Sequence, residues 1–334
     1  MRLPAIALSI LMGLAAAARA EGVPVRVGVI PVIGAAPVFV ARSEGWLREA
    51  GLEPTFTTFE SGPNMIQALA SGTIDVYVAG IAPLAVARSK GIDVRVVAAT
   101  AVEEMVFVAA PKLAPYFARA ASQAEAFREF RAKTGRAARL ATQPPGSVPN
   151  TTLQHWLWQV AKVDRADAEI VAMGIDATQQ ALLAGAVDGA SIREPALTIV
   201  QGRNPAMTLI ANGAQMFPDQ PGTVVGVYGK FVDRNPAAVE GLVRAVVKAT
   251  ALLKTDPDRA APAVEAALGK GLTDTATIRR ALTSPAAKFT ADPRVIVDAT
   301  RKMQAYQVTI GTLDRDVPID GLFDPSFYER AAKP

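Results

Sequence analysis

The sequence lacks cysteine entirely and contains a single histidine, His155, in 334 residues. The absence of cysteine excludes disulfides, thiolate metal sites, cysteine nucleophiles and iron–sulfur clusters. One histidine without cysteine cannot form a typical zinc site, so we expect no metal or cofactor and interpret His155 as an exposed or interfacial helix residue. Phosphate-loop, dinucleotide-binding and nucleophile-elbow glycine motifs are also missing.

The chain has little excess charge and no long apolar run after its first residues. Its 35 lysines and arginines face 31 aspartates and glutamates, and the basic residues are scattered. A nucleic-acid partner is therefore not expected. A membrane helix requires about 20 apolar residues, and no segment after the N-terminus provides them.

The N-terminus has the pattern of a cleaved signal peptide. Arg2 precedes an uncharged apolar stretch over residues 5–18, and Ala18-Arg19-Ala20 is a small-x-small cleavage signature. We predict a signal peptide over residues 1–20, cleavage after Ala20 and a periplasmic mature chain. The alternative is an uncleaved anchor. No cysteine follows the signal, so a lipid anchor is not expected.

Strand and helix signals alternate over two stretches of the chain. In the first, strands are predicted at 25–30, 53–59, 74–79 and 94–99, with helices at 37–50, 61–72 and from Pro83. In the second, strands at 139–142, 169–173 and 189–192 alternate with helices at 151–162 and from Asp176, where a capping box is predicted. Helix starts at Asn235, Asp256, Thr273, Asp292 and Asp324 make the C-terminal third helical. This order predicts an α/β fold of two lobes with mostly parallel sheets.

One internal similarity supports two lobes of like design. Residues 67–75 align with residues 180–188 at an offset of 113 (180 − 67). Each copy ends a helix, turns at glycine and leads through Asp75 or Asp188 into a short strand. Coincidence between two helix–glycine–strand joins is the alternative. We predict lobe 1 over 21–103 and 213–334, and lobe 2 over 104–212. Crossing strands are predicted near 100–110 and 205–225.

Several segments resemble one protein family in their order and spacing. They are Val25–Pro31, Ala36–Leu47, Phe59–Asp75, Ala184–Pro195 and Phe231–Val239. Together they resemble the nitrate/sulfonate/taurine-type, or NMT1-like, substrate-binding proteins of ABC transporters, over nearly the whole mature chain. The resemblance implies a type II periplasmic-binding fold, with a ligand in the cleft between lobes and closure on binding. The family often has an aromatic residue directly before the Glu-Pro pair, where this chain has Arg193, so no relative's ligand is carried over.

The loops after the strands predict where a ligand binds. In open α/β sheets, ligands lie beyond the carboxyl ends of the strands, where helix N-termini favour anions. Glycines there allow close approach of the backbone, and hydroxyl, amide and charged side chains supply polar contacts. The predicted ligand contacts are Ile33, Gly34, Ala35, Ser61, Gly62, Gly80, Ile81, Gly146, Ser147, Val148, Asn150, Arg193 and Glu194.

Some of these residues have an equally good structural interpretation. Ser61 could act only as a helix N-cap, and Gly34 could only form a turn. Arg193 could pair with an anionic ligand, or it could bridge to Glu194 or a surface acid, and Glu194 could bind a ligand donor or brace the hinge. Glu103 and Glu104 are expected on a solvated face of the hinge.

Apolar residues in the same loops favour a ligand with a non-polar body. They are Val32, Ile33, Ile81 and Val148. An organic sulfonate or carboxylate, or a flat heteroaromatic compound, fits this pattern better than nitrate does.

The combined interpretation is the periplasmic solute-binding subunit of an ABC importer. We expect a non-enzymatic monomer that captures a small organic anion and delivers it to a permease in the inner membrane. One alternative is the binding of a pyrimidine precursor of thiamine. A thiamine-pyrimidine-synthase-like enzyme is disfavoured, because such enzymes rely on a cysteine-rich iron motif. A third possibility is a sensor that presents its ligand to a membrane kinase.

Overall fold

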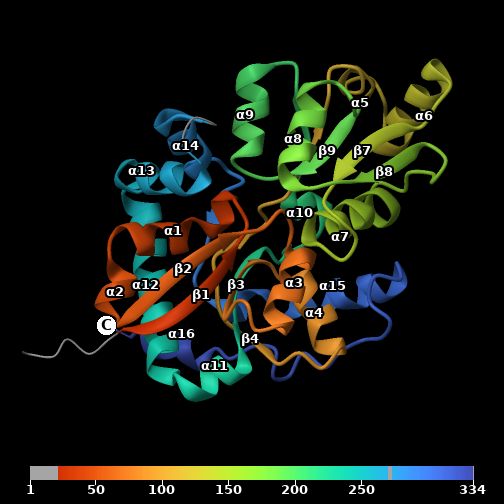
Figure 1. Cartoon of the computed structure of the whole chain (residues 1–334). Helices are drawn as coiled ribbons and strands as arrows, with labels where there is room; N and C mark the ends of the chain where they lie inside the picture. Colours follow the sequence, from red (N-terminus) through yellow and green to blue (C-terminus); the bar gives the residue numbers. More distant parts are fainter. Residues whose placement is uncertain (1–21, 270–272, 334) are drawn as a thin grey trace, which may run out of the picture.

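The computed structural model describes residues 22–269 and 273–333 (Figure 1). The predicted signal peptide over residues 1–20 and its cleavage after Ala20 lie outside these residues. Within the described ranges, no helix combines the length and apolar character needed to cross a membrane.

Two five-stranded sheets form the centres of the molecule. The first has the strand order β2-β1-β3-β11-β4 and the second the order β10-β6-β9-β7-β8. In each sheet one strand runs against the others: β11 pairs antiparallel with β3 and β4, and β6 pairs antiparallel with β9 and β10. The first sheet consists of β1 Val23–Val29, β2 Leu52–Thr58, β3 Val76–Gly80, β4 Val94–Ala99 and β11 Thr223–Tyr228. The second consists of β6 Val106–Ala109, β7 Ala138–Thr142, β8 Ala168–Ala172, β9 Gly189–Ile192 and β10 Thr208–Asn212.

The central strands lie where the apolar runs predicted them. β3, β6 and β9 are buried along their whole length, as expected for strands covered by helices on both faces. One large apolar cluster surrounds the first sheet, and two smaller clusters cover the two faces of the second. The mostly parallel α/β architecture predicted from the sequence is confirmed.

The helix predicted over 37–50 is interrupted. A short 3₁₀ turn, η1 Ile33–Ala35, leads into α1 Ala36–Ser43, and α2 Trp46–Glu49 follows after a break. Gly45 makes the break because its φ of 80° is left-handed, a conformation that glycine adopts without steric cost. The long apolar stripe is thereby divided between two short helices that both pack on the first sheet.

Helices α3 Gly62–Ala70 and α4 Ala82–Ser89 complete the first set of alternating elements. Ser61 caps α3 as predicted, with its Oγ accepting a hydrogen bond from the Asn64 N–H at 3.4 Å. The role of Ser61 as an N-cap is therefore confirmed.

Two helices of the second set begin earlier than predicted. The set comprises α5 Ala114–Phe117, α6 Gln123–Thr134, α7 Val148–His155 with the π-helical turn η2 Trp156–Val160, α8 Ile175–Leu183 and α9 Ala196–Arg203. α7 begins at Val148 because Ser147 caps it by accepting from the Asn150 N–H at 3.3 Å. α8 has Gly174 at its N-cap, so Asp176 lies in the first turn and forms no capping box.

The chain passes between the sheets twice. It leaves β4 through β5 Ala101–Val102 to enter β6, and it returns from β10 through α10 Gly213–Met216 to enter β11. These two passages fall in the segments where crossing strands were predicted. The lobe boundaries after residues 103 and 212 lie within them and stay predictions.

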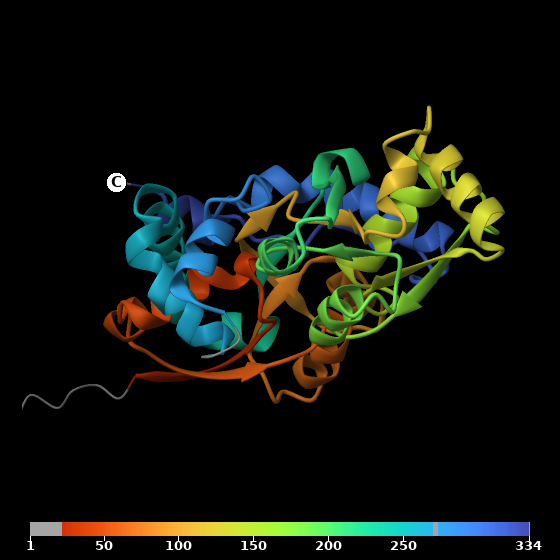
Figure 2. The same ribbon diagram turned by 90° about the horizontal axis from the view of Figure 1, so that it is seen from above.

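The C-terminal helices brace both sheets (Figures 1 and 2). Helix α12 packs on α1 and α16 beside the first sheet, whereas α14 contacts α9 and α15 contacts α7 of the second set. The sequence analysis had assigned this block to the first lobe. The block comprises α11 Gly229–Arg234, α12 Pro236–Thr255, α13 Pro257–Leu268, α14 Thr275–Leu282, β12 Lys288–Phe289, η3 Pro293–Ile296, α15 Val297–Thr309 and α16 Ser326–Ala331.

Candidate functional site

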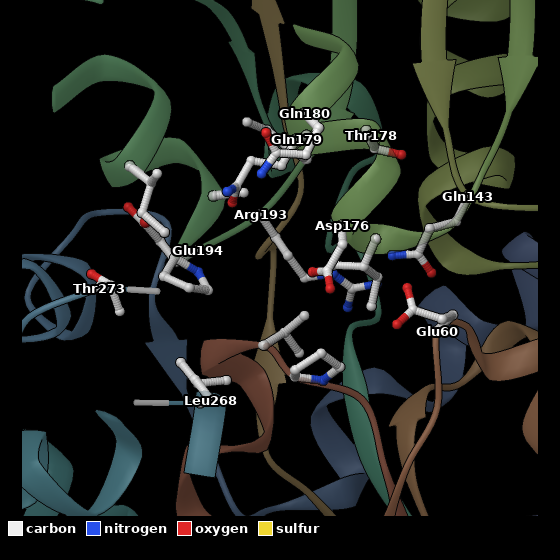
Figure 3. Close-up of a pocket in the computed structure, with 18 of the residues that line it drawn as sticks. Glu60, Gln143, Asp176, Thr178, Gln179, Gln180, Arg193, Glu194, Leu268 and Thr273 are labelled. Carbon is white, nitrogen blue, oxygen red and sulfur yellow. The ribbon is translucent and has the colours of Figure 1, made fainter. Parts of the chain in front are cut away.

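A cavity of about 360 Å³ opens between the two sheets. The first sheet contributes Pro31 and Val32 after β1, and Thr58 and Glu60 at the end of β2. The second sheet contributes residues after β7 and β9 and the first turns of α8 and α9, while the end of α13 forms one edge (Figure 3). The cavity therefore lies beyond strand ends, where the sequence placed the ligand. Its size is within the range of small-molecule sites, about 300–1,000 Å³.

The wall of the cavity is rich in polar side chains. Its charged and polar residues are Thr58, Glu60, Gln143, Asp176, Thr178, Gln179, Gln180, Ser191, Arg193, Glu194, Arg203 and Thr273. Figure 3 shows Glu60, Gln143, Asp176 and Arg193 converging on one part of the cavity from different elements. Arg203 lies at the opposite end of α9 from Glu194, about two helical turns away.

Arg193 is held by a buried carboxylate. Its Nη1 lies 2.8 Å from Glu104 Oε1, and both residues are less than 5% exposed. Thr223 on β11 donates its hydroxyl to the same oxygen at 2.6 Å, and Arg193 Nη1 lies 3.4 Å from that hydroxyl. Arg193 follows β9 of the second sheet, whereas Thr223 belongs to the first. The ion pair therefore joins the two sheets at the passage between β5 and β6.

The expectation that Glu104 lies on a solvated face is wrong. Glu103 is partly buried and pairs with Lys288. Glu104 instead turns inward, because β6 begins two residues after it and Arg193 offers a buried positive charge. A buried carboxylate requires such a partner, since its desolvation costs several kcal/mol.

Gly34 provides the space that this ion pair needs. A Cβ at position 34 would lie 2.2 Å from Glu104 Oε2 and 2.6 Å from Thr223 Oγ1. Any side chain at this position would displace the carboxylate. The sequence suggested that a ligand approaches the backbone of Gly34 closely. In this structure the Glu104 carboxylate occupies that place.

Glu194 caps the start of α9. Its carboxylate accepts hydrogen bonds from the Thr198 N–H and Thr198 Oγ1, both at 3.0 Å. Burial raises the pKa of the Glu194 carboxyl above its usual value, and the Thr198 hydrogen bonds only partly oppose this effect. The backbone carbonyl of Glu194 also accepts from the Ile33 N–H at 3.0 Å, which links the two sets of loops.

Strand-end loops of the two sheets, including several predicted ligand contacts, approach one another across the cleft. A Cβ on Gly80, after β3, would lie 2.7 Å from Val148 Cγ2 at the start of α7. A Cβ on Gly174, at the start of α8, would lie 3.0 Å from Glu60 Oε2. Together with the hydrogen bond between Ile33 and Glu194, these contacts define a closed arrangement of the two lobes.

The predicted site residues divide into three groups. Arg193 and Glu194 line the main cavity. A narrow recess beside it is lined by Gly62, Gly80, Ser147 and Val148 together with Arg193, and another by Ile33 and Gly34 together with Glu194. In the part of the chain that the structure describes, the remaining residues are buried outside these recesses: Ala35, Ser61, Ile81, Gly146 and Asn150. Their contact with a ligand stays a prediction.

Ten of the twelve polar residues of the cavity were not among the contacts predicted from the sequence, and four of them show what was missed. Glu60 and Gln143 each stand at the start of a loop that the strand-end rule had named, so their position was a usable signal. Asp176 was assigned to a helix cap, and Gln179 follows it by one turn on the same helix. Gln143 and Arg193 are each the first residue after a strand, whereas Glu60 is the second residue after β2.

His155 lies at an interface, as expected. Its ring packs between Phe217 and Tyr306, with ring centroids 4.4 and 5.0 Å away, and Nδ1 lies 2.9 Å from the Met216 carbonyl oxygen. Burial lowers the pKa of His155. Within residues 22–269 and 273–333, no group of three His, Asp or Glu side chains is placed to hold a metal ion.

Comparison with known proteins gives consistent results. The sequence profile of the NMT1-like family matches residues 18–268. The chain is 25% identical over 236 residues to the nitrate import ATP-binding protein NrtC of Synechococcus elongatus, a match that covers 70% of this chain and 36% of that protein. The chain thus spans about a third of the length of this curated relative.

Two solved structures share the fold. The periplasmic nitrate-binding protein NrtA from Synechocystis PCC 6803 superposes with a TM-score of 0.75 at 15% identity, covering 93% of this chain and 89% of that one. The alkanesulfonate-binding protein SsuA from Xanthomonas axonopodis pv. citri, bound to MOPS, gives 0.72 at 20% identity, with coverages of 91% and 99%. The periplasmic-binding-protein fold predicted from the sequence is confirmed.

Proposed function

The chain belongs to the NMT1-like family, and on that basis we propose that it is the periplasmic solute-binding subunit of an ABC importer. In this role it captures a small organic molecule between its lobes and delivers it to a permease in the inner membrane. The observation that carries the proposal is the polar cavity between the carboxyl ends of two similar sheets. The similarity to binding proteins for nitrate and alkanesulfonate supports the same role.

The proposed ligand carries an anionic group of the sulfonate or carboxylate type. Arg193 lines the cavity, and its Nε–H has no hydrogen-bond partner among the described residues although it is buried. A buried donor without a partner costs about 1–3 kcal/mol, and because Nε has no accessible surface, a ligand acceptor reaches it only if the Arg193 side chain moves. Glu104 engages only Nη1, which leaves the other guanidinium donors available.

A double variant tests the role of Arg193 without leaving a buried charge unpaired. Arg193→Met combined with Glu104→Gln removes the ion pair as a unit. We expect the Kd of an anionic ligand to rise at least tenfold, because a hydrogen bond to a charged group contributes about 1.5–3 kcal/mol. The matched control is Arg131→Met with Asp167→Asn. These two residues form an ion pair with an N–O distance of 3.3 Å, and neither lines the cavity. Equal affinity of both double variants and the wild type would remove Arg193 from the ligand site.

The transport role and the compartment have their own measurements. Native mass spectrometry of protein purified from a periplasmic extract is expected to reveal a retained small organic acid. N-terminal sequencing of the same sample is expected to begin at Glu21, and its native mass is expected to be that of a monomer. A chain that begins at Met1 and remains with the membrane would contradict the predicted signal peptide.

A further inference from the structure

Apolar side chains cross between the cores of the two lobes. Val148 begins α7 of the second set, yet it is fully buried in the large apolar cluster around the first sheet. It packs against the bare backbone of Gly80, in a recess that Ile30 and Pro83 also line. Ala286, which follows α14 in the C-terminal block, belongs to an apolar cluster of the second sheet. Separating the two sheets would therefore return buried apolar surface to water, which is unfavourable.

Buried polar groups join the sheets in the same region. The Thr223 hydroxyl of β11 donates to Glu104, and the same carboxylate oxygen pairs with Arg193 after β9. The Ile33 N–H, after β1, donates to the Glu194 carbonyl oxygen at 3.0 Å. All five residues are less than 6% exposed. Each of these contacts joins two protein groups, so the closed arrangement is stabilised by the chain itself.

From these contacts we infer that the closed arrangement is the resting state of the protein. The lobes are fastened at the base of the cleft before a solute binds, and the solute enters a cavity that is already assembled. Closure on binding, which the family resemblance implies, is then not required. A preorganised site loses little binding free energy to conformational change. The inference rests on the proposed solute-binding function and adds the conformation in which the protein awaits its solute.

The cysteine-free chain allows the closed state to be locked as a reference. Glu60 follows β2 of the first sheet, and Gly174 precedes α8 of the second set. A Cβ on Gly174 would lie 3.5 Å from the Glu60 Cβ, and disulfides join Cβ atoms about 3.5–4.5 Å apart. Glu60→Cys with Gly174→Cys should therefore form a disulfide across the closed cleft, and no native cysteine competes. Glu60→Ser with Gly174→Ser is the matched control that cannot cross-link.

The first measurement compares the oxidised and reduced forms of the cysteine pair by small-angle X-ray scattering. The protein is first stripped of any retained solute by dialysis in guanidinium chloride and refolding, and native mass spectrometry verifies the removal. We expect the disulfide to form completely without added solute. We also expect the reduced form and the serine control to have the same radius of gyration as the oxidised form. A reduced form that is measurably larger than the oxidised form overturns the inference.

Val148→Asp tests whether the contacts at the base of the cleft hold the lobes together. In the closed arrangement this carboxylate would be buried in an apolar cluster, which is costly without a partner. In an open arrangement it would lie in water at the first turn of α7, where a negative charge is favoured. In the cysteine-pair background we expect a larger radius of gyration when reduced and disulfide formation at least tenfold slower. Where this variant fails to fold, Val148→Thr gives the same comparison with a smaller effect.

Val160→Asp is the matched control, because Val160 is a valine of the same helical segment that is 46% exposed. It is expected to keep the compact form and the rapid cross-link. If the variants of Val148 remain as compact as this control and cross-link as fast, the buried contacts do not fasten the lobes and the inference is overturned.

The outcomes separate this inference from the proposed function. Scattering and cross-linking use no solute, so an open resting state overturns the fastened arrangement and leaves solute binding intact. A closed resting state supports the inference on its own. The proposed function is judged separately, by whether the protein isolated from the periplasm retains any small solute in native mass spectrometry.

Discussion

The two sheets of the molecule share one plan but differ at the strand ends. In the first, Asp75 precedes β3 and accepts hydrogen bonds from the Arg26 N–H at 3.0 Å and from the Arg26 guanidinium at 2.6 and 2.8 Å. In the second, Asp188 precedes β9 and accepts from the Arg139 N–H at 2.8 Å and from the Arg136 guanidinium at 2.6 and 2.9 Å. The aspartates and the strand arginines that they contact both repeat at the offset of 113 found in the sequence.

The same offset exposes where the lobes diverge. Gly80 at the end of β3 corresponds to Arg193 after β9. One position provides space, because Val148 of the other lobe packs against the bare backbone. The other provides charge, directed into the cavity and held by Glu104. The repeated aspartate–arginine contacts thus align the strand ends of each sheet. The position that differs, Gly80 in one lobe and Arg193 in the other, determines which side chain of that lobe faces a ligand or the other lobe.

The largest effect is expected from removing the charge that balances Arg193. Glu104→Gln leaves a buried guanidinium without a carboxylate, which should lower the free energy of unfolding by about 3–5 kcal/mol. Urea denaturation followed by circular dichroism measures this change. Adding Arg193→Met should recover part of the loss, since no buried charge then remains. A double variant less stable than Glu104→Gln alone would contradict the assignment of a buried ion pair.

A smaller loss of stability is expected from adding a side chain at Gly80, the position that corresponds to Arg193. Gly80→Ala places a Cβ 2.7 Å from Val148 Cγ2, so the closed arrangement must open slightly or repack. Overpacking of this kind costs about 1–3 kcal/mol. We expect a larger radius of gyration by small-angle X-ray scattering with ligand present, and weaker ligand binding. Adding Val148→Ala should restore both, whereas failure of this rescue would show that the contact does not control closure.

The repeated aspartates should contribute similarly to stability. Asp75→Asn and Asp188→Asn each weaken hydrogen bonds to an arginine whose side chain is about half exposed. We expect losses of about 1–2 kcal/mol in the free energy of unfolding, reduced from the buried value by solvent screening. Denaturation of the two variants at pH 7 tests the equivalence. A difference of several kcal/mol would mean that the two lobes do not use this motif in the same way.

The pH dependence of the stability that Asp188 contributes provides a second test of this motif. Burial alone would raise the pKa of Asp188, but hydrogen bonds from Arg136 and the Arg139 N–H outweigh it and lower the pKa below its usual value. A lowered pKa in the folded state stabilises the protein above the unfolded pKa, and this contribution is lost as pH falls through the folded value. The gap in stability between wild type and Asp188→Asn should therefore narrow below about pH 4.

The sequence was sufficient for features that depend on local pattern. Apolar runs located β4 and β9 at their observed bounds, and serine before proline located the start of α3. The partner of Arg193 could not be predicted in this way, because Glu104 is 89 positions away and meets it only after the chain crosses between sheets. Asp176 was misassigned for a related reason: its sequence context fits a helix cap, and only the fold reveals that Gly174 takes that place.

The smallest change in stability is expected at Glu194, which directly follows Arg193. Its folded pKa is raised by burial, so the folded protein holds a proton there more tightly than the unfolded chain does. The contribution of this group is fully present below the unfolded pKa of about 4.5 and is lost as pH rises through the raised folded value. Glu194→Gln removes this titration but retains an acceptor for Thr198. The stability of the variant relative to wild type should therefore increase from pH 4 to pH 7 in thermal denaturation, and a constant difference across that range would mean that burial does not perturb this carboxyl.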